Sequence, residues 1–145
     1  MKIDWDGIHD AFIFGSMEGS YLLDKKTGKT VVYHESELEW SDITEADLED
    51  DPERYIEIEP PSSDERYDWM ADYAEGVTDE QVGDALARAL GGRRPFRRFK
   101  DVLEGHAAER EAWFAFEDEK IKGAIEEWVK DSGLAPENPP PWRVG

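Results

Sequence analysis

The sequence predicts an α+β fold, in which a small antiparallel sheet, made of a hairpin plus a third strand, is covered by about four to five helices. Three observations predict it. Two β-prone runs flank a polar turn, a strictly alternating run precedes a double proline, and the C-terminal half has helical spacing throughout. A chain of 145 residues has the size of one ordinary domain. We therefore expect one α+β domain over residues 1–132 and a proline-rich tail over residues 133–145.

A short helix is predicted near the N-terminus. Three apolar residues recur there at helical spacing and would share one side: Ile8, Ala11 and Phe12. Either Asp4 or Asp6 can cap the start of this helix with a side-chain oxygen. Gly7 weakens the helix, because glycine loses more backbone freedom than other residues.

The sheet is predicted from a hairpin of two runs and one further strand. Tyr21–Leu23 and Thr30–Tyr33 are β-prone runs on either side of a polar turn in which Gly28 can take a left-handed conformation, the pattern of a β-hairpin. In residues 55–59, Tyr and Glu alternate with Ile, which is the period of a half-buried strand that Pro60 then ends. The preceding residues have too few apolar side chains for a core, so we expect a solvated loop with one short helical turn.

Two helices are predicted between residues 62 and 91. The first begins at Ser62, with Glu65 three residues later, the spacing of a capping box. The second begins at Thr78, with Gln81 in the same relation. It ends at Gly91–Gly92, because glycine readily adopts the conformation that closes a helix.

Two further helices and a tail complete the prediction. Pro95 begins a helix at a first-turn position, where its missing N–H costs nothing. The last helix runs from about Ala108 to Ser132, and beyond it we expect a frayed terminus. Its apolar stripe consists of Trp113, Phe114, Ile121, Ala124, Ile125 and Trp128.

Four runs of the sequence arrive in the order of a known family. They are YLLDKKTGKTVVY, RYIEIEPPSSDERYDWMADY, RALGGRRPFRRFKDVL and WFAFEDEKIKGAIEEWV. The most specific piece is Phe96–Asp101, followed by Trp113 and Trp128 at the expected distances. Over about Tyr21–Pro136 the chain resembles the bacterial Uncharacterised Protein Family zero-one-five-eight. The resemblance implies a small bacterial α+β protein, and it implies no activity or catalytic residue.

Composition narrows the classes of function. The chain has 36 Asp and Glu against 17 Lys and Arg, and its net charge of −19 opposes binding to nucleic acid or to anionic membranes. It has no cysteine, which excludes disulfides, thiolate metal sites and cysteine nucleophiles. The N-terminus lacks the basic start of a secretory signal, and no apolar run approaches the roughly 18 residues of a spanning helix. We expect a cytoplasmic protein without a membrane segment.

The stretch GGRRPFRRFK, Gly91–Lys100, concentrates five basic residues and no acidic one. At helical spacing, Phe96 and Phe99 anchor one side, and the guanidinium groups point away from that anchor. Guanidinium groups match phosphate and carboxylate geometry bidentately, and a helix start attracts anions. We therefore hypothesise a site that binds an acidic or phosphorylated protein partner. Its residues are Arg93, Arg94, Arg97, Arg98 and Lys100.

The same arginines also have a structural explanation. Glu117 falls inside the apolar stripe of the last helix, where a carboxylate is costly unless it is paired. Arg97 or Arg98 is an available partner. We expect internal pairing for at least two of the arginines.

Two other functions stay open. Glu35–Glu59 holds twelve acidic residues and one basic residue, so it can imitate nucleic acid and act as a decoy for a basic protein. A solvated acidic loop is the simpler explanation of the same charges. A small enzyme can use the arginines to hold a phosphate-bearing substrate. His9, His34 and His106 show no metal-ligand spacing, however, and we expect binding rather than catalysis, with no metal or cofactor.

Trp69 is a candidate partner contact. It lies away from the apolar stripe of its helix, and an exposed tryptophan often anchors a partner. A wide buried helix face explains it equally. The sequence leaves the partner's identity and the oligomeric state open.

Overall fold

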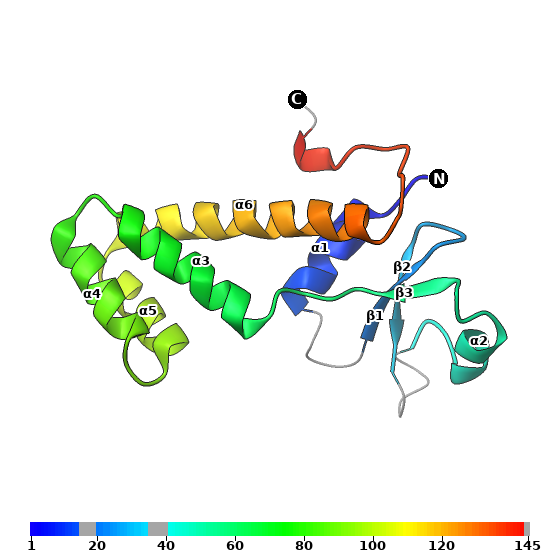
Figure 1. Cartoon of the computed structure of the whole chain (residues 1–145), viewed down its shortest axis with the longest axis horizontal. Helices are drawn as coiled ribbons and strands as arrows, with labels where there is room; N and C mark the ends of the chain where they lie inside the picture. The colour runs from blue at the N-terminus through cyan, green and yellow to red at the C-terminus, as the bar shows by residue number, and fades with distance from the viewer. Residues whose placement is uncertain (15–19, 35–40, 144–145) are drawn as a thin grey trace. The chain divides into compact units, whose positions relative to one another are not determined.

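A three-stranded antiparallel sheet and a series of helices make up residues 1–14, 20–34 and 41–143, which are the residues that this computed structural model describes (Figure 1). The predicted α+β class is confirmed. In chain order the elements are α1 (Trp5–Phe14), β1 (Ser20–Asp24), β2 (Thr30–Tyr33), α2 (Glu45–Asp50), β3 (Tyr55–Glu57), α3 (Ser63–Gly76), α4 (Glu80–Leu90), α5 (Pro95–Glu104), α6 (Ala107–Asp131) and the 3-10 turn η1 (Pro141–Arg143).

The contacts between residues divide the chain into two units. The first unit comprises Met1–Pro60 and Lys122–Gly145, and the second comprises Pro61–Ile121. Helix α6 contributes its first part to the second unit and its last part to the first. The predicted boundary between a domain and a tail at residue 132 stays a prediction.

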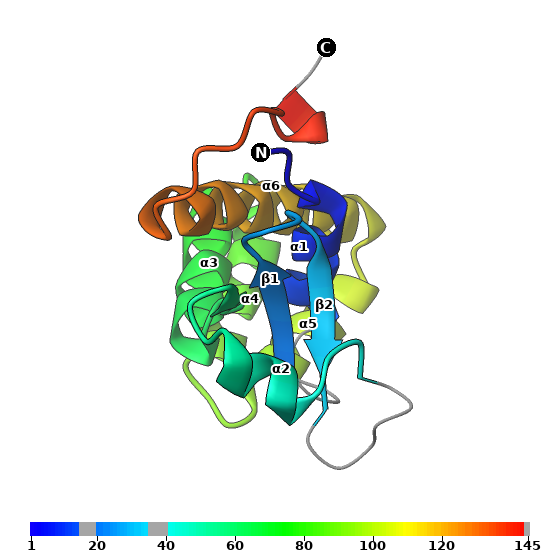
Figure 2. The same cartoon turned by 90° about the vertical axis from the view of Figure 1, so that its right-hand side faces the viewer.

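The sheet of the first unit has the strand order β2-β1-β3, and Figure 2 shows β1 and β2 side by side. In the predicted hairpin, Leu22 pairs with Val31. Gly28 has a φ of +77°, as predicted, and a Cβ there would also collide with the carbonyl oxygen of Lys2. Glycine is therefore required at this turn for two reasons.

Helix α1 confirms the predicted N-terminal helix. Ile8, Ala11 and Phe12 are all buried. Asp4 supplies the cap, because its Oδ1 accepts a hydrogen bond from the Gly7 N–H at 3.0 Å. Gly7 has a packing reason to be small, since a Cβ there would collide with the Thr30 hydroxyl and the Asp4 carboxylate.

The segment before β3 differs slightly from its prediction. Helix α2 is the predicted short helical turn, and it begins with a capping box between Thr44 and Asp47. Ile43, however, is buried in the core of the first unit, so this segment is not wholly solvated. Ile58, just after β3, is 3% exposed and confirms the alternation expected of a half-buried strand.

The predicted frayed C-terminus is wrong. The Asn138 side chain accepts a hydrogen bond from the Ile3 N–H at 2.9 Å and donates one to the Ile3 carbonyl oxygen at 2.8 Å. The Trp5 indole N–H donates to the Asn138 carbonyl oxygen at 3.0 Å. The Trp142 ring lies edge-on to Trp5, with 5.8 Å between the ring centroids. We call residues 137–143 the C-terminal clasp.

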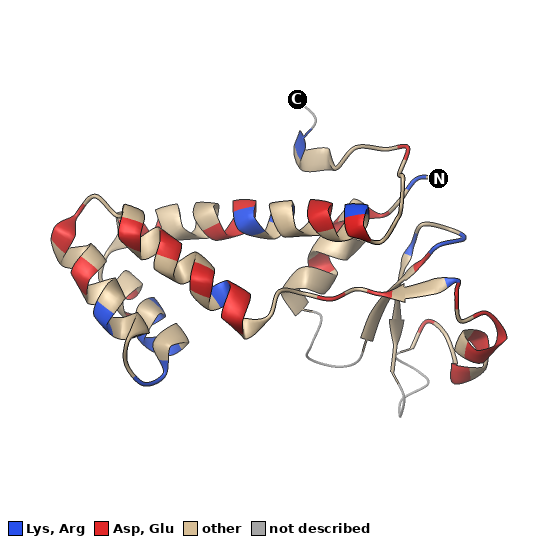
Figure 3. Ribbon diagram, viewed as in Figure 1, with Lys and Arg blue, Asp and Glu red and all other residues tan. Residues whose placement is uncertain are grey.

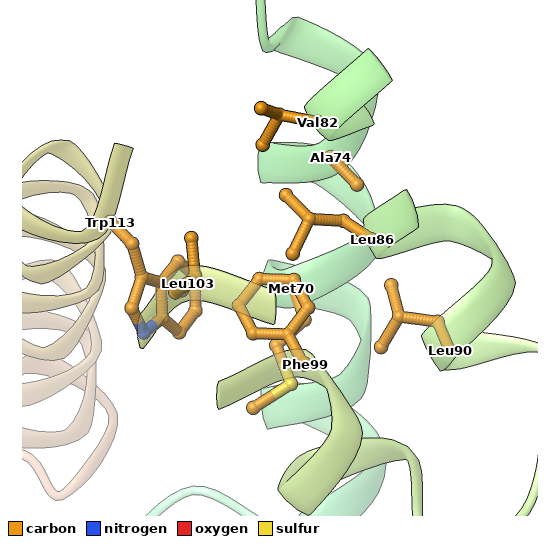
Figure 4. Close-up of a cluster of buried hydrophobic side chains, with 8 residues drawn as sticks. All are labelled: Met70, Ala74, Val82, Leu86, Leu90, Phe99, Leu103 and Trp113. Carbon is orange, nitrogen blue, oxygen red and sulfur yellow. The ribbon is translucent and has the colours of Figure 1, made fainter. Parts of the chain in front are cut away.

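The second unit is held by one hydrophobic cluster. Figure 4 shows side chains from α3, α4, α5 and α6 converging on it. Its buried members are Met70, Ala74, Val82, Leu86, Leu90, Phe99, Leu103 and Trp113. Ser62 caps α3 as predicted, but the cap of α4 is Asp79 rather than Thr78. Aspartate ranks above threonine as a helix cap, and it stands one residue nearer to the first turn.

The predicted apolar stripe of α6 is correct for most of its members and wrong for Phe114. Trp113, Ile121 and Ile125 are buried, whereas Phe114 is 51% exposed. The Arg110 guanidinium lies over the Phe114 ring at 5.4 Å from its centroid. The predicted stripe is therefore too wide, because it includes Phe114, which the second unit leaves at its surface.

Candidate functional site

The link between α4 and α5 gathers four arginines at the start of one helix. Helix α4 ends at Leu90, and two glycine N–H groups close it: that of Gly91 donates to the Ala87 carbonyl oxygen at 3.1 Å, and that of Gly92 to the Ala89 carbonyl oxygen at 3.4 Å. Arg94 then has a φ of +50°, and Pro95 follows at the first position of α5. The left-handed region costs a residue other than glycine about 1–3 kcal/mol, so the surrounding structure must hold this turn.

Buried residues of the second unit hold the turn in place. Phe99 has no exposed surface and Leu103 is 2% exposed, so the inner side of α5 is fixed. The Tyr67 hydroxyl of α3 donates to the carbonyl oxygen of Leu90 at 2.8 Å, which fixes the end of α4. The arginines lie on a well-supported turn rather than on a loose loop.

The predicted basic residues of Gly91–Lys100 are all exposed. Figure 3 shows blue segments of the ribbon along the α4–α5 turn and on α5. We call this set the arginine surface: Arg93, Arg94, Arg97, Arg98 and Lys100. Arg94 is the N-cap residue of α5, and Arg97 and Arg98 follow it by three and four residues in the first turns of the helix.

The predicted pairing of Glu117 with Arg97 or Arg98 is wrong. Burial raises the pKa of Glu117, and the cations that oppose this rise are Arg66 and Lys100. Within residues 1–14, 20–34 and 41–143, none of the four arginines of the arginine surface forms an ion pair.

The arginine surface is electrostatically unfavourable for the fold itself. The first turn of α5 has no acidic residue, and the Arg94 side chain makes no capping hydrogen bond. A helix start carries about half a positive charge and favours anions, so cations weaken it. Like charges three or four residues apart repel by about 0.2–0.5 kcal/mol per pair. Residues that break such a local rule without compensation are expected at functional sites.

Two members of the arginine surface have particular surroundings. The Lys100 ammonium lies close enough to Glu117 to lower the pKa of that carboxyl group, so this lysine already has an anionic neighbour. The Arg98 guanidinium lies against Gly92, because a Cβ at Gly92 would stand 3.0 Å from Arg98 Nη1.

Sequence reasoning missed Arg66 and the contact between Gly92 and Arg98. Arg66 lies in α3 and acts on Glu117 in α6, so only the packing of the second unit relates them. The sequence explains Gly92 as part of a helix end. Nothing in the sequence around it indicates a contact with Arg98.

Trp69 is half-buried and packs against the hydrophobic cluster of the second unit. This placement supports the explanation by a wide buried helix face. The partial exposure that remains leaves a partner contact as a prediction.

The described part of the acidic segment, residues 41–59, carries nine acidic residues and Arg54. Figure 3 shows α2 largely in red, and α2 has no buried residue. Arg54 binds Asp24 of β1 through two hydrogen bonds. Residues 35–40, the start of the predicted decoy segment, lie outside the described residues.

Across the described ranges, no group of three or more His, Asp or Glu residues is placed to hold a metal ion. No helix in those ranges is long and apolar enough to cross a membrane.

Comparison with known proteins places the chain in a family. The model of the Uncharacterised protein family (UPF0158) matches residues 1–138. The chain belongs to this family. It is similar to the UPF0158 protein PA5073 of Pseudomonas aeruginosa, with 28% identity over 136 residues that cover 94% of this chain and 86% of the relative. No solved structure matches the chain. The resemblance predicted from the sequence is confirmed.

Proposed function

We propose that this chain is a binding protein whose arginine surface docks an acidic or phosphorylated segment of a partner protein. One observation carries the proposal. In a chain with 36 acidic residues, four arginines gather exposed at one helix start and form no ion pair within the described residues. Such guanidinium groups bind carboxylate or phosphate through two parallel hydrogen bonds.

The helix start strengthens the same preference. Arg94, Arg97 and Arg98 all lie at the start of α5, and the first-turn N–H groups of α5 receive no side-chain cap from Arg94. An anion placed there would meet guanidinium groups, backbone donors and the positive end of the helix dipole together.

The net charge favours a short anionic segment over a long polyanion. The charge of −19 repels an extended nucleic acid along its whole length. At physiological salt the Debye length is about 8 Å, so a short segment on the arginine surface is screened from most of the distant carboxylates.

A thermal unfolding measurement in sulfate or phosphate tests the proposal. Either anion should raise the melting temperature more than chloride does at the same ionic strength. The increment should be lost in Arg97→Ala and kept in Arg110→Ala, which changes an exposed arginine of the same unit outside the arginine surface. Equal increments in the two variants would exclude the arginine surface as the anion site.

The acidic segment supports a second candidate, a decoy for a basic nucleic-acid-binding protein. Its supporting observation is that α2 presents four carboxylates and buries none of its residues. A basic partner should be captured from host lysate and released by salt. Reversing the charge of Glu45, Glu49 and Asp50 should abolish this capture, and capture that survives the reversal would remove the decoy.

A further inference from the structure

An open surface cavity of about 290 Å³ lies in the second unit, where the α3–α4 loop meets the first turns of α6, and several of its lining residues are exposed. Val77, Ala108 and Ala112 give it an apolar lining, and Tyr73 forms part of its wall. Ligand pockets span about 300–1,000 Å³, so this cavity accepts a group of side-chain size.

Two carboxylates, Asp79 and Glu109, also line the cavity. Asp79 Oδ1 accepts hydrogen bonds from the N–H groups of Gln81 at 3.0 Å and Val82 at 3.3 Å, which leaves Oδ2 for another donor. Within the described part of the chain, neither Asp79 nor Glu109 forms an ion pair. The cavity therefore has two negative charges without a cationic partner there.

Tyr73 connects the wall of the cavity both to Glu109 and to the hydrophobic cluster. Its hydroxyl donates to the main-chain oxygen of Glu109 at 2.7 Å. Burial and the charge of Glu109 raise the pKa of Tyr73, so the phenol stays neutral at physiological pH. Its ring also contacts Trp113, at 5.4 Å between centroids, which ties the wall to the hydrophobic cluster.

The charges around the cavity favour a cation. The starts of α4 and α6 contribute only partial positive charges, and each already carries one of the two carboxylates. The end of α3 has no basic residue in its last turn, so its carbonyl groups add negative potential. Arg110, next to Glu109 in the chain, lies over the Phe114 ring and does not line the cavity.

We propose that this cavity binds an alkylammonium group, with the aliphatic chain on Val77, Ala108 and Ala112 and the ammonium between Asp79 and Glu109. An alkylammonium group packs its apolar stem on apolar surface and keeps its charged end in polar surroundings. This cavity offers both, because its apolar lining lies beside the two carboxylates. A lysine side chain of a partner and a free diamine share this chemistry. The site is separate from the arginine surface and does not depend on it.

A titration of the isotope-labelled full chain, followed by amide NMR, tests this site. The probes are N-acetyl-lysine methylamide and 1,4-diaminobutane, and the controls are N-acetyl-norleucine methylamide and sodium chloride at matched ionic strength. At least one cationic probe should give saturable shifts at Val77, Thr78 and Ala112, whereas the controls should not. Stronger binding of the lysine derivative would identify a partner's side chain, and stronger binding of the diamine a free amine.

Two variants approach the same site differently. Ala112→Leu fills the cavity, and the double variant Asp79→Asn with Glu109→Gln removes both charges while keeping an acceptor for the α4 cap. Each should weaken binding at least tenfold. Glu75→Gln, an exposed change on α3 outside the lining, should leave binding unchanged. Shifts that do not saturate, or an unchanged affinity in the charge-removed variant, would overturn the proposal.

Discussion

The Arg54 guanidinium holds the Asp24 carboxylate through two hydrogen bonds, from Nε to Oδ1 at 2.9 Å and from Nη2 to Oδ2 at 2.8 Å. Asp24 is the last residue of β1 and is 4% exposed, and Arg54 immediately precedes β3. The pair therefore fastens the third strand to the hairpin. The guanidinium lowers the pKa of Asp24 from 3.8 to about 2.

Breaking this pair should be costly. Arg54→Met leaves the Asp24 carboxylate without its partner and should lower the free energy of unfolding by more than the control below does. Arg143→Met is the matched control, because Arg143 binds Glu126 equally through two hydrogen bonds, 2.8 and 2.9 Å long, at an exposed position. The control should cost less than about 1 kcal/mol. Urea unfolding at pH 7 measures both, and equal losses would contradict the assigned burial of Asp24.

The same pair sets a pH dependence. The pKa of Asp24 is lower in the folded state, so the folded chain binds fewer protons here than the unfolded chain. Its stabilisation is fully present above about pH 4 and is lost as the pH falls towards 2. The difference in unfolding free energy between wild type and Asp24→Asn should shrink over that range, and a constant difference would contradict the pKa assignment.

Glu117 should behave in the opposite way. Burial raises its pKa, so the folded chain binds the proton more tightly and the ionised group weakens the fold as the pH rises above its ordinary range. Glu117→Gln should stabilise the protein at pH 7 by less than about 1 kcal/mol, because Arg66 and Lys100 offset part of the penalty. The gain should vanish near pH 4. Destabilisation by several kcal/mol at pH 7 would contradict this account and would show that Glu117 forms the buried ion pair expected from the sequence.

The C-terminal clasp should contribute to stability. Asn138→Ala removes the two side-chain hydrogen bonds to Ile3 and should cost about 1–3 kcal/mol, since backbone groups lose their partners. Glu137→Ala removes only an exposed contact with the N-terminal amine and serves as the control. Denaturant unfolding separates the two, and a loss below about 0.5 kcal/mol for Asn138→Ala would show a clasp that is open in solution.

Arg97 should favour anion binding and lower the stability of the fold. This residue is the third of α5, where a glutamate complements the helix dipole. Arg97→Glu should raise the free energy of unfolding by about 0.3–1 kcal/mol. It should also abolish the increment in melting temperature that sulfate gives to the wild type. A destabilised Arg97→Glu would mean that Arg97 serves the fold.

Local signals predicted most of the fold. Alternation predicted β3, the paired runs around Gly28 predicted the hairpin, and Pro95 predicted the start of α5. Each of these signals could be recognised because it depends only on neighbours in the chain. The clasp could not be predicted, since Asn138 acts on Ile3 across almost the whole length of the chain. Proline-rich composition described only the local chain and indicated a frayed end.

The candidate site divides in the same way. Phe99 and the exposed arginines follow from helical spacing, and both are where that spacing places them. The partners of Glu117 were misassigned because only the packing of α3, α5 and α6 decides which cations approach it. The cavity beside Tyr73 carries no motif, because its lining comes from segments more than 25 residues apart.

The measurement that tests the central claim most directly is the fluorescence anisotropy of a labelled, glutamate-rich phosphoserine peptide titrated with the full chain. Changing Arg94, Arg97 and Arg98 together to Ala should weaken binding at least tenfold, and the wild-type affinity should fall as salt rises. Arg110→Ala should bind like the wild type. Equal affinities for the wild type and a folded triple variant, or no binding by the wild type at low salt, would contradict the assignment of the arginine surface as a docking site.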